Sequence, residues 1–329
     1  MNIELSTLNW EKGGVAMNGD LSRKVLKDVS RSFYLSLRFL PKGFRAPTSI
    51  GYLLARASDT IADAGQLCVE ERRDLLVRFI EFVTHGKIFK IPKIDGLPEG
   101  EQVLISRLSD CVAALENLPD WQQISVRKVV GIITEGQCWD LDRFSDEGVV
   151  CLGEDRELRT YTYQVAGCVG EFWTEIGFGD NRDFARASFD EMMEWGKAYG
   201  RSLQLINILR DVPEDGKNGR CYLPGAETRE RLLRERQRWI KEAREGLDLA
   251  ERYAKSLNGK RMRFGTVLPA MIGRRTLDRL ELASWENWES GVKISRKEVY
   301  CMMAKAARFA VSYIFLSLIP IMSDIGSKL

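Results

Sequence analysis

Apolar residues recur at spacings of three and four along almost the whole chain, and this periodicity restricts the fold more than any other feature. Strand-like alternation of apolar and polar residues is rare. The period predicts helices over residues 21–40, 48–64, 69–84, 101–116, 121–141, 157–177, 184–212, 227–257, 262–289 and 296–319. The sequence therefore predicts an all-α fold.

Two loops interrupt the helical pattern, a stretch rich in glycine and proline over residues 86–100 and a second one over residues 145–155. Both are short and lie between helical patterns that could share one core. We therefore expect a single helical domain over residues 20–329, preceded by a flexible extension over residues 1–19.

Charge and rare residues exclude several classes of protein. Lys and Arg (49) nearly balance Asp and Glu (47), so the net charge of +2 argues against a nucleic-acid partner. The seven cysteines form no Cys-x-x-Cys pair and no secretory signal opens the chain, which predicts free thiols in the cytoplasm. The single His85 argues against Ser-His-Asp chemistry and His-rich zinc sites. We expect carboxylates, tyrosines and arginines to carry the chemistry.

The longest apolar stretch, residues 309–322, is shorter than the ~20 residues that span a bilayer. We interpret it as a final core helix in preference to a membrane-surface anchor, because such anchors usually carry a polar face rich in Lys and Arg. We expect a soluble monomer, and the sequence leaves open a peripheral contact with the inner face of a membrane.

Two pairs of aspartates are the strongest candidates for chemistry. Asp59 and Asp63 are four residues apart, as are Asp211 and Asp215, so each pair lies on one face of its helix. Each pair follows an apolar stretch, which predicts that it ends a buried helix. Buried carboxylates need a counter-charge, and two such pairs facing each other suit Mg²⁺, which also binds phosphate oxygens.

A polar stripe extends the second pair towards the N-terminus. Gln204, Asn207, Asp211 and Asp215 stand at positions i, i+3, i+7 and i+11 of an otherwise apolar helix. Each unsatisfied buried polar group would cost about 1–3 kcal/mol. We therefore predict that the stripe lines a cavity that holds metal, water or ligand.

Basic residues accompany both pairs. Arg56 precedes Asp59 by three residues and Arg210 directly precedes Asp211, so both guanidinium groups could bind a diphosphate bidentately. The glycine-rich residues 215–224 (DGKNGRCYLP) follow, with Lys217 and Arg220 able to fold over a phosphate. We predict a mobile lid there; the alternative is a flexible surface turn.

Several motifs, in this order, resemble the squalene/phytoene synthase family. They are residues 30–33 (SRSF), 56–63 (RASDTIAD), 161–170 (YTYQVAGCVG), 204–215 (QLINILRDVPED) and 219–224 (GRCYLP). The resemblance covers roughly residues 20–320. The pattern Asp-Thr-x-x-Asp in the second of them is closer in style to squalene synthases. In the third, close helix packing and room for a prenyl chain explain the small residues 166–170 equally well.

The resemblance implies an isoprenoid-synthase fold around a central apolar cavity, with prenyl diphosphates as substrates. By this likeness, the Mg²⁺ ligands are Asp59, Asp63, Asn207, Asp211 and Asp215. The groups that bind phosphate or line the substrate region are Ser32, Phe33, Tyr52, Arg56, Arg210, Lys217 and Arg220. Tyr161 and Gln204 lie beside the reacting carbons.

The leading hypothesis is a squalene synthase, which condenses two farnesyl diphosphates head to head through presqualene diphosphate and reduces the product with NADPH. The alternative is an enzyme that makes presqualene diphosphate, dehydrosqualene or phytoene without reduction. A terpene cyclase and a non-catalytic scaffold that kept the fold are more remote. Two departures from the family bear on the site: Ser58 replaces an aspartate common in phytoene synthases, and Pro213 should kink the helix between Asp211 and Asp215.

Overall fold

The computed structural model describes residues 24–30, 37, 40–144 and 148–323, with the backbone alone from 313 to 323. Ser32, Phe33 and the extension predicted over residues 1–19 lie outside the described residues. The chain divides into two compact units, Met1–Thr134 and Glu135–Leu329, and each is described by itself. A single domain over residues 20–329 stays a prediction.

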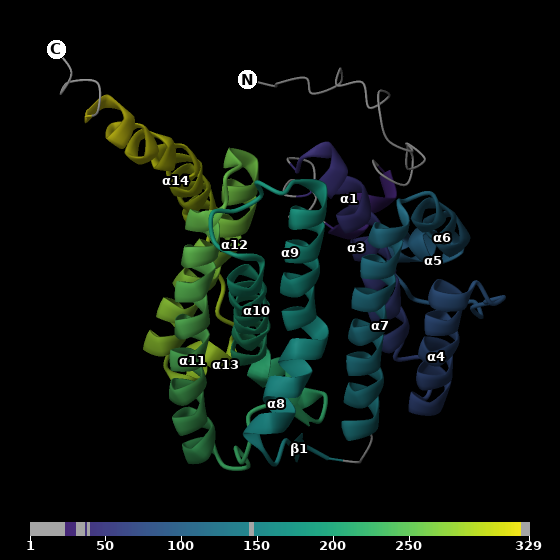
Figure 1. The fold of residues 1–329 in the computed structure, drawn as a ribbon. Helices are drawn as coiled ribbons and strands as arrows, with labels where there is room; N and C mark the ends of the chain where they lie inside the picture. The colour runs from purple at the N-terminus through teal and green to yellow at the C-terminus, as the bar shows by residue number, and fades with distance from the viewer. Residues whose placement is uncertain (1–23, 31–36, 38–39, 145–147, 324–329) are drawn as a thin grey trace. The chain divides into compact units, whose positions relative to one another are not determined.

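Helices make up nearly all of the regular secondary structure in the described chain (Figure 1), so the all-α prediction is confirmed. The first unit contains α1 (Leu26–Ser30), α3 (Lys42–Ala62), α4 (Val69–His85), α5 (Glu99–Ser106), α6 (Leu108–Glu116) and the N-terminal part of α7 (Asp120–Arg143). The second contains the rest of α7, β1 (Val150–Cys151), α8 (Asp155–Thr162), the π-helical η2 (Tyr163–Gly167), α9 (Cys168–Asp180), α10 (Phe189–Lys217), β2 (Arg220–Cys221), α11 (Arg229–Ser256), α12 (Lys260–Leu282), α13 (Trp285–Glu289) and α14 (Arg296–Ser323).

Helix α3 organises the first unit and positions the first aspartate motif. Its apolar residues Ile50, Leu53, Leu54, Ala57 and Ile61 follow the helical period and are all buried. Through this face α3 packs on α4, α5 and α6. The loop predicted after α4 is confirmed, since no helix resumes before Glu99.

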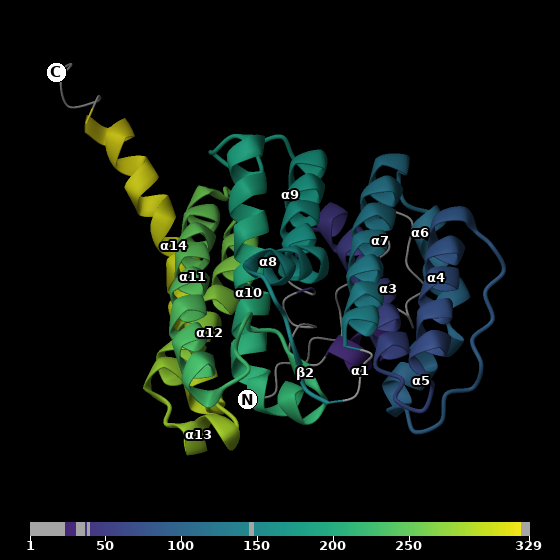
Figure 2. The ribbon, with the colours of Figure 1, turned by 90° about the horizontal axis from the view of Figure 1, so that it is seen from below.

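Helix α10 is the centre of the second unit and packs on η2, α9, α11 and α12 (Figure 2). Small residues allow this approach: a Cβ atom on Gly170 would lie 1.9 Å from the carbonyl oxygen of Gly196, and one on Gly200 would lie 2.2 Å from that of Ala166. Of the two explanations for the small residues 166–170, close helix packing is therefore confirmed.

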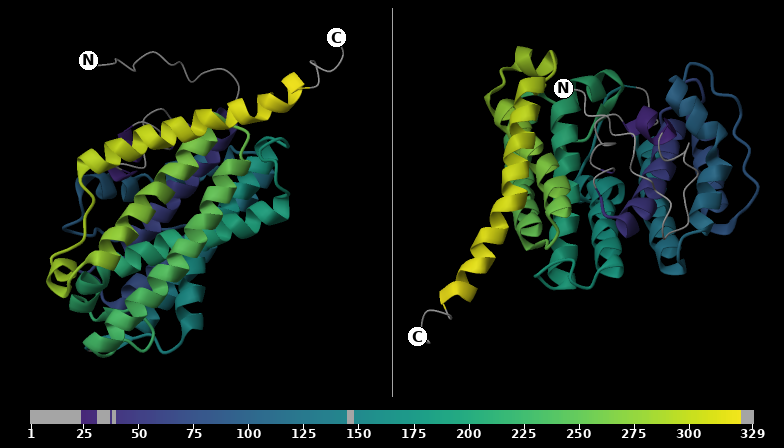
Figure 3. Two further views of the ribbon diagram at one scale, coloured as in Figure 1. Left: turned by 90° about the vertical axis from the view of Figure 1, so that its left-hand side faces the viewer. Right: turned by 90° about the horizontal axis from the view of Figure 1, so that it is seen from above.

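The last helix, α14, lies along α12 (Figure 3). Met302, Ala306 and Ala310 are buried, and buried Arg263 of α12 donates to the carbonyl oxygen of Ala310 at 3.5 Å. Of the stretch 309–322, Ala310 is buried and Val311 is 49% exposed. The side chains beyond residue 312 lie outside the described set, so a final core helix stays a prediction. Among the helices that the structure describes, none is long and apolar enough to cross a membrane.

Some helix boundaries differ from the prediction. The segment 101–116 is two helices that meet at Arg107, and 262–289 breaks at Ala283 before Ser284 caps α13 by accepting from the backbone amide of Asn287 at 3.2 Å. Helix α10 continues through Pro213 to Lys217. The expected disruption at Pro213 thus does not end the helix before Asp215.

Candidate active site

The first aspartate motif stands at the C-terminal end of α3. Asp59 lies in the last turn with its side chain 46% exposed, and Asp63 follows the helix end and is exposed. The pair ends a buried helix as predicted, but the expectation that its carboxylates are buried is wrong at Asp63. The buried face of α3 is taken by Ala57, Ser58 and Ile61, which places the carboxylates on the other side.

Arg56 is already paired with carboxylates. It donates a hydrogen bond to Glu101 of α5, a residue that the sequence did not single out, and lies 3.9 Å from Asp59. Thr60 also donates to Glu101, at 3.1 Å. Burial lowers the pKa of Arg56, but the hydrogen bond and charge of Glu101 outweigh it, and the net shift is upward. Glu101 therefore orients the guanidinium group that we predicted to bind phosphate.

Tyr52 belongs to the same group of side chains. Its hydroxyl donates to the carbonyl oxygen of Val29 at 3.3 Å. Burial is the main cause that raises its pKa, and the charges of Arg56, Asp59 and Glu101 also act on it. The structure thus brings together Tyr52, Arg56 and Asp59, as the sequence predicted.

The second motif lies on the C-terminal half of α10. Asn207 is exposed and donates to Gln204 at 3.5 Å, one turn before the aspartates. Arg210 binds the carboxylate of Asp211 through two hydrogen bonds of 2.7 and 2.5 Å. The polar stripe is therefore present, and Arg210 neutralises one of its two carboxylates.

Asp215 carries a charge that the site does not fully compensate. Burial and the neighbouring Asp211 raise its pKa to about 7, although Arg220 acts to lower it. A carboxylate pair with surplus negative charge fits a hard divalent cation, which binds oxygen and would lower this pKa. Within the described part of the chain, no three His, Cys, Asp or Glu side chains are grouped closely enough to hold a metal by themselves. Further oxygens would have to come from a ligand or water.

The segment predicted as a lid contains regular structure. Asp215 to Lys217 are the last turn of the helix, and Arg220 and Cys221 form β2, which pairs in parallel with β1. Backbone hydrogen bonds hold this pairing, among them Leu152 N to Cys221 O at 3.0 Å. Residues 215–217 and 220–221 thus lie in regular structure, and whether the segment moves as a lid stays a prediction. Lys217 is exposed, near Glu214, whereas Arg220 points into the site.

A buried hydrogen-bonded network lies at β2. Tyr222 donates to Oδ1 of Asp140, at the end of α7, at 2.7 Å, and Arg220 lies 3.2 Å from Oδ2 of the same carboxylate. The hydroxyls of Tyr161 and Tyr222 act on each other's pKa. Burial, with the charge of Asp140, raises the pKa of both tyrosines well above the ordinary value. Both are therefore neutral phenols near pH 7.

Aromatic rings surround this network. The rings of Tyr161 and Tyr222 stack at 5.0 Å between centroids, Trp139 lies 5.6 Å from Tyr161, and Phe144 lies 5.0 Å from Tyr222. Such faces attract cations. The structure thus places Tyr161 among aromatic rings that lie next to Asp140 and Arg220.

Sequence reasoning missed Glu101, Asp140, Tyr222 and Trp139. Tyr222 is two residues after Arg220 in the segment 219–224, so the motif that pointed to Arg220 also pointed to Tyr222. Trp139 and Asp140 form an aromatic–acid pair inside an otherwise periodic helix, which is a weak signal. No sequence signal singled out Glu101, because it resembles an ordinary acidic residue at the start of a helix.

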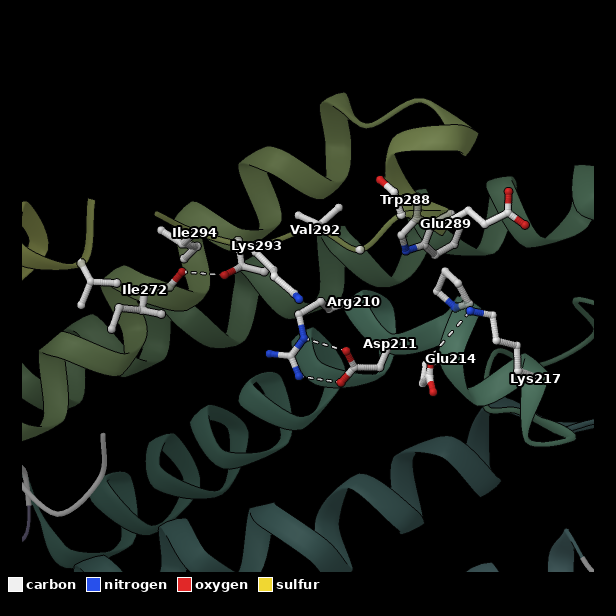
Figure 4. A pocket seen from close by; sticks show the side chains of 15 residues that line it. Arg210, Asp211, Glu214, Lys217, Ile272, Trp288, Glu289, Val292, Lys293 and Ile294 are labelled. Atoms are coloured by element: carbon white, nitrogen blue, oxygen red, sulfur yellow. Dashed lines mark hydrogen bonds and ion pairs between the residues drawn. The ribbon is translucent and has the colours of Figure 1, made fainter. Parts of the chain in front are cut away.

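A cavity of about 700 Å³ lies beside the second motif. Figure 4 shows Arg210, Asp211, Glu214 and Lys217 of α10 on one side of it, with Trp288, Val292 and Lys293 on the other. Three cationic side chains therefore line the cavity, next to the aspartates.

Comparison with known proteins gives consistent matches. Residues 26–298 match the family model described as squalene/phytoene synthase. The 4,4′-diapophytoene synthase of Staphylococcus haemolyticus is 27% identical over 65% of this chain and 64% of its own length. The presqualene diphosphate synthase of Zymomonas mobilis is 29% identical over 63% and 60%.

Among solved structures, the complex of TcSQS with the ligand BPH1237 has a TM-score of 0.75 and 20% identity, over 88% of this chain and 86% of that one. At that identity the likeness shows the fold. The chain spans between 25% and 64% of the length of the curated relatives it matches. Since the family model covers most of the chain, this protein belongs to the squalene/phytoene synthase family.

Proposed function

We propose that this protein joins two farnesyl diphosphates head to head to presqualene diphosphate and converts that product to squalene with NADPH. The observation that carries the proposal is the buried chain of hydroxyls from Tyr161 through Tyr222 to Asp140, in an aromatic setting and next to the carboxylates of α10. Head-to-head coupling creates an allylic cation and then loses a proton. This arrangement suits both events.

The diphosphate groups are the first requirement. In the second unit Asn207, Asp211 and Asp215 would bind Mg²⁺, and the raised pKa of Asp215 supports this. In the first unit Asp59 and Asp63 would bind Mg²⁺ in the same way. When bound, Mg²⁺ would neutralise the diphosphate that leaves. Arg220 would add a cation at the same place. Its partner Asp140 also accepts a hydrogen bond from Tyr222, so Asp140 keeps one partner when Arg220 binds phosphate.

The allylic cation needs stabilisation and protection from water. The faces of Trp139 and Tyr161 supply negative electrostatic potential without a nucleophile. Because burial keeps Tyr161 as a neutral phenol, its oxygen does not trap the cation as a phenolate would.

The proton released on ring closure needs an acceptor. A proton released beside the oxygen of Tyr161 would pass to the Tyr222 hydroxyl as Tyr222 gives its own proton to the carboxylate of Asp140, to which it donates at 2.7 Å. Arg220 lies 3.2 Å from that carboxylate and offsets its negative charge between turnovers. In this path Tyr222 relays the proton and Asp140 accepts it.

NADPH would bind in the cavity next to α10. The volume of about 700 Å³ falls in the range of cofactor sites, and Lys217 and Lys293 would supply cations for its phosphate groups. Lys293→Glu should weaken NADPH binding at least about tenfold, measured by nucleotide fluorescence without turnover. Lys305→Glu, an exposed residue of α14 away from the cavity lining, is the matched control.

The test of the reaction is direct. Purified protein is incubated with farnesyl diphosphate and Mg²⁺, with and without NADPH, and the extracted products are identified by mass spectrometry. Squalene that requires NADPH would support the whole proposal. Presqualene diphosphate or dehydrosqualene regardless of NADPH would keep the coupling and reject the reduction. Cyclic products from one diphosphate, or no turnover with any prenyl diphosphate, would reject the coupling itself.

A further inference from the structure

Two cysteines lie side by side where β1 and β2 pair. Cys151 is the register partner of Cys221 in this parallel pair, so their side chains project from the same face. Adjacent strands are about 4.8 Å apart, within the Cα separation of about 4.4–6.8 Å that a disulfide accepts. The Cys221 thiol donates to the carbonyl oxygen of Leu223 at 3.6 Å, and the neighbouring Cys151 thiol is one of the groups that raise its pKa. Both residues are free thiols and half-buried.

The pair is placed where a covalent link would act on the site. Cys221 lies between Arg220, which binds Asp140, and Tyr222, which donates to it. The pairing that positions this segment rests on backbone hydrogen bonds such as Val150 N to Gly219 O at 2.9 Å. A bond between the two sulfur atoms would add a covalent link to this hydrogen-bonded pairing.

We propose that Cys151 and Cys221 are a thiol-oxidation site, at which a peroxide joins the two sulfur atoms and ties β1 to β2. One thiolate attacks an oxygen of hydrogen peroxide, which breaks the O–O bond and gives a sulfenic acid and hydroxide. The second thiol attacks that sulfur and expels the oxygen as water. In total, two thiols and one peroxide give a disulfide and two waters. A dithiol reverses the change by exchange.

The surroundings set the rate of this reaction. Burial, followed by the neighbouring Cys151 thiol, raises the pKa of Cys221 to about 12. The thiolate is the reactive form, so the pair should react slowly at neutral pH and faster as the pH rises. In a reducing compartment the thiols persist, and only sustained oxidant closes the link.

The test uses the full-length protein at about pH 8.5, where thiolates are more abundant, treated with hydrogen peroxide and digested without reduction. We expect a cross-linked peptide pair that contains Cys151 and Cys221, lighter than the two reduced peptides by two hydrogen atoms and separated by dithiothreitol. Hydrogen exchange of backbone amides over residues 216–226 should slow by about tenfold in the oxidised protein. Neither readout depends on prenyl transfer, so the result is independent of the proposed function.

Variants separate this site from oxidation elsewhere. Cys151→Ser should lose both the cross-link and the slower exchange, whereas Cys68→Ser/Cys301→Ser, which removes the exposed thiols, should keep both. A protein in which Cys151 and Cys221 become sulfinic acids without cross-linking would overturn the proposal. So would a cross-link that leaves the exchange of residues 216–226 unchanged, because the bond would then not constrain the segment.

Discussion

The hydroxyl of Tyr222 donates to the buried carboxylate of Asp140 at 2.7 Å, although the two residues are 82 positions apart. This bond ties the segment after α10 to the C-terminal end of α7. Arg220 reaches the other oxygen of the same carboxylate, so both oxygens of Asp140 are engaged. A buried carboxylate in this position orients a tyrosine and an arginine together.

Tyr222→Phe should lower both the free energy of unfolding and kcat. It removes one buried hydrogen bond while Arg220 still balances the charge of Asp140, so we expect a loss of about 1–3 kcal/mol in the free energy of unfolding. Interruption of the path from Tyr161 should lower kcat by about 10²-fold. Urea denaturation and product formation measure the two effects. Tyr300→Phe, which alters a tyrosine that is 68% exposed, should change neither.

The pKa of Asp215, raised to about 7, makes a prediction about pH. A carboxyl group whose pKa is higher in the folded than in the unfolded protein favours folding when protonated, so that contribution is complete below about pH 4 and is lost as the pH rises towards 7. Without Mg²⁺, the unfolding midpoint of Asp215→Asn should therefore fall less than that of the parent protein between pH 5 and 8. Equal slopes in the two proteins would show that Asp215 does not titrate there.

The same carboxyl group should couple pH to metal binding. Mg²⁺ binds the ionised form, so its affinity for the parent protein should rise through about pH 7, as Asp215 loses its proton. Isothermal titration calorimetry at several pH values measures this, with a bound diphosphate analogue to complete the ligands. In Asp215→Asn the affinity should be lower and nearly independent of pH over that range. A parent protein whose affinity is flat with pH would contradict the assignment.

Periodicity in the sequence was enough to predict the helices, because burial of one face per helix leaves a repeat of apolar residues. It could not predict the break at Arg107, where neither proline nor glycine marks the end of α5. The spacing of Asp211 and Asp215 correctly placed both on one face of α10. The partners of Arg56 and Tyr222 could not be predicted, since Glu101 and Asp140 meet them through tertiary packing across 45 and 82 positions.

Glu101 should stabilise the first unit through its contact with Arg56. Glu101→Gln keeps the shape but removes the charge that Arg56 and Thr60 contact. Since Glu101 is 16% exposed, we expect a loss of about 1–3 kcal/mol in the free energy of unfolding. Asp110→Asn is the matched control, because its pair with Arg107 is 50% exposed on the aspartate and should contribute less than about 1 kcal/mol. Equal losses in the two variants would mean that burial of the Glu101 pair is not what matters.

The contact between α9 and α10 depends on glycine at its closest point. In Gly170→Ala the new Cβ would lie 1.9 Å from the carbonyl oxygen of Gly196, so the helices must move apart. We expect a loss of about 1–3 kcal/mol or more in the free energy of unfolding, with lower turnover because α10 carries Asp211. In Gly131→Ala, a helical site with no atom within 4 Å of the new Cβ, alanine should instead stabilise by about 0.5–1 kcal/mol. Because both changes add the same methyl group within a helix, opposite signs in thermal and urea unfolding would isolate the packing term. A stabilised Gly170→Ala protein would show that α9 and α10 are not in the close contact described.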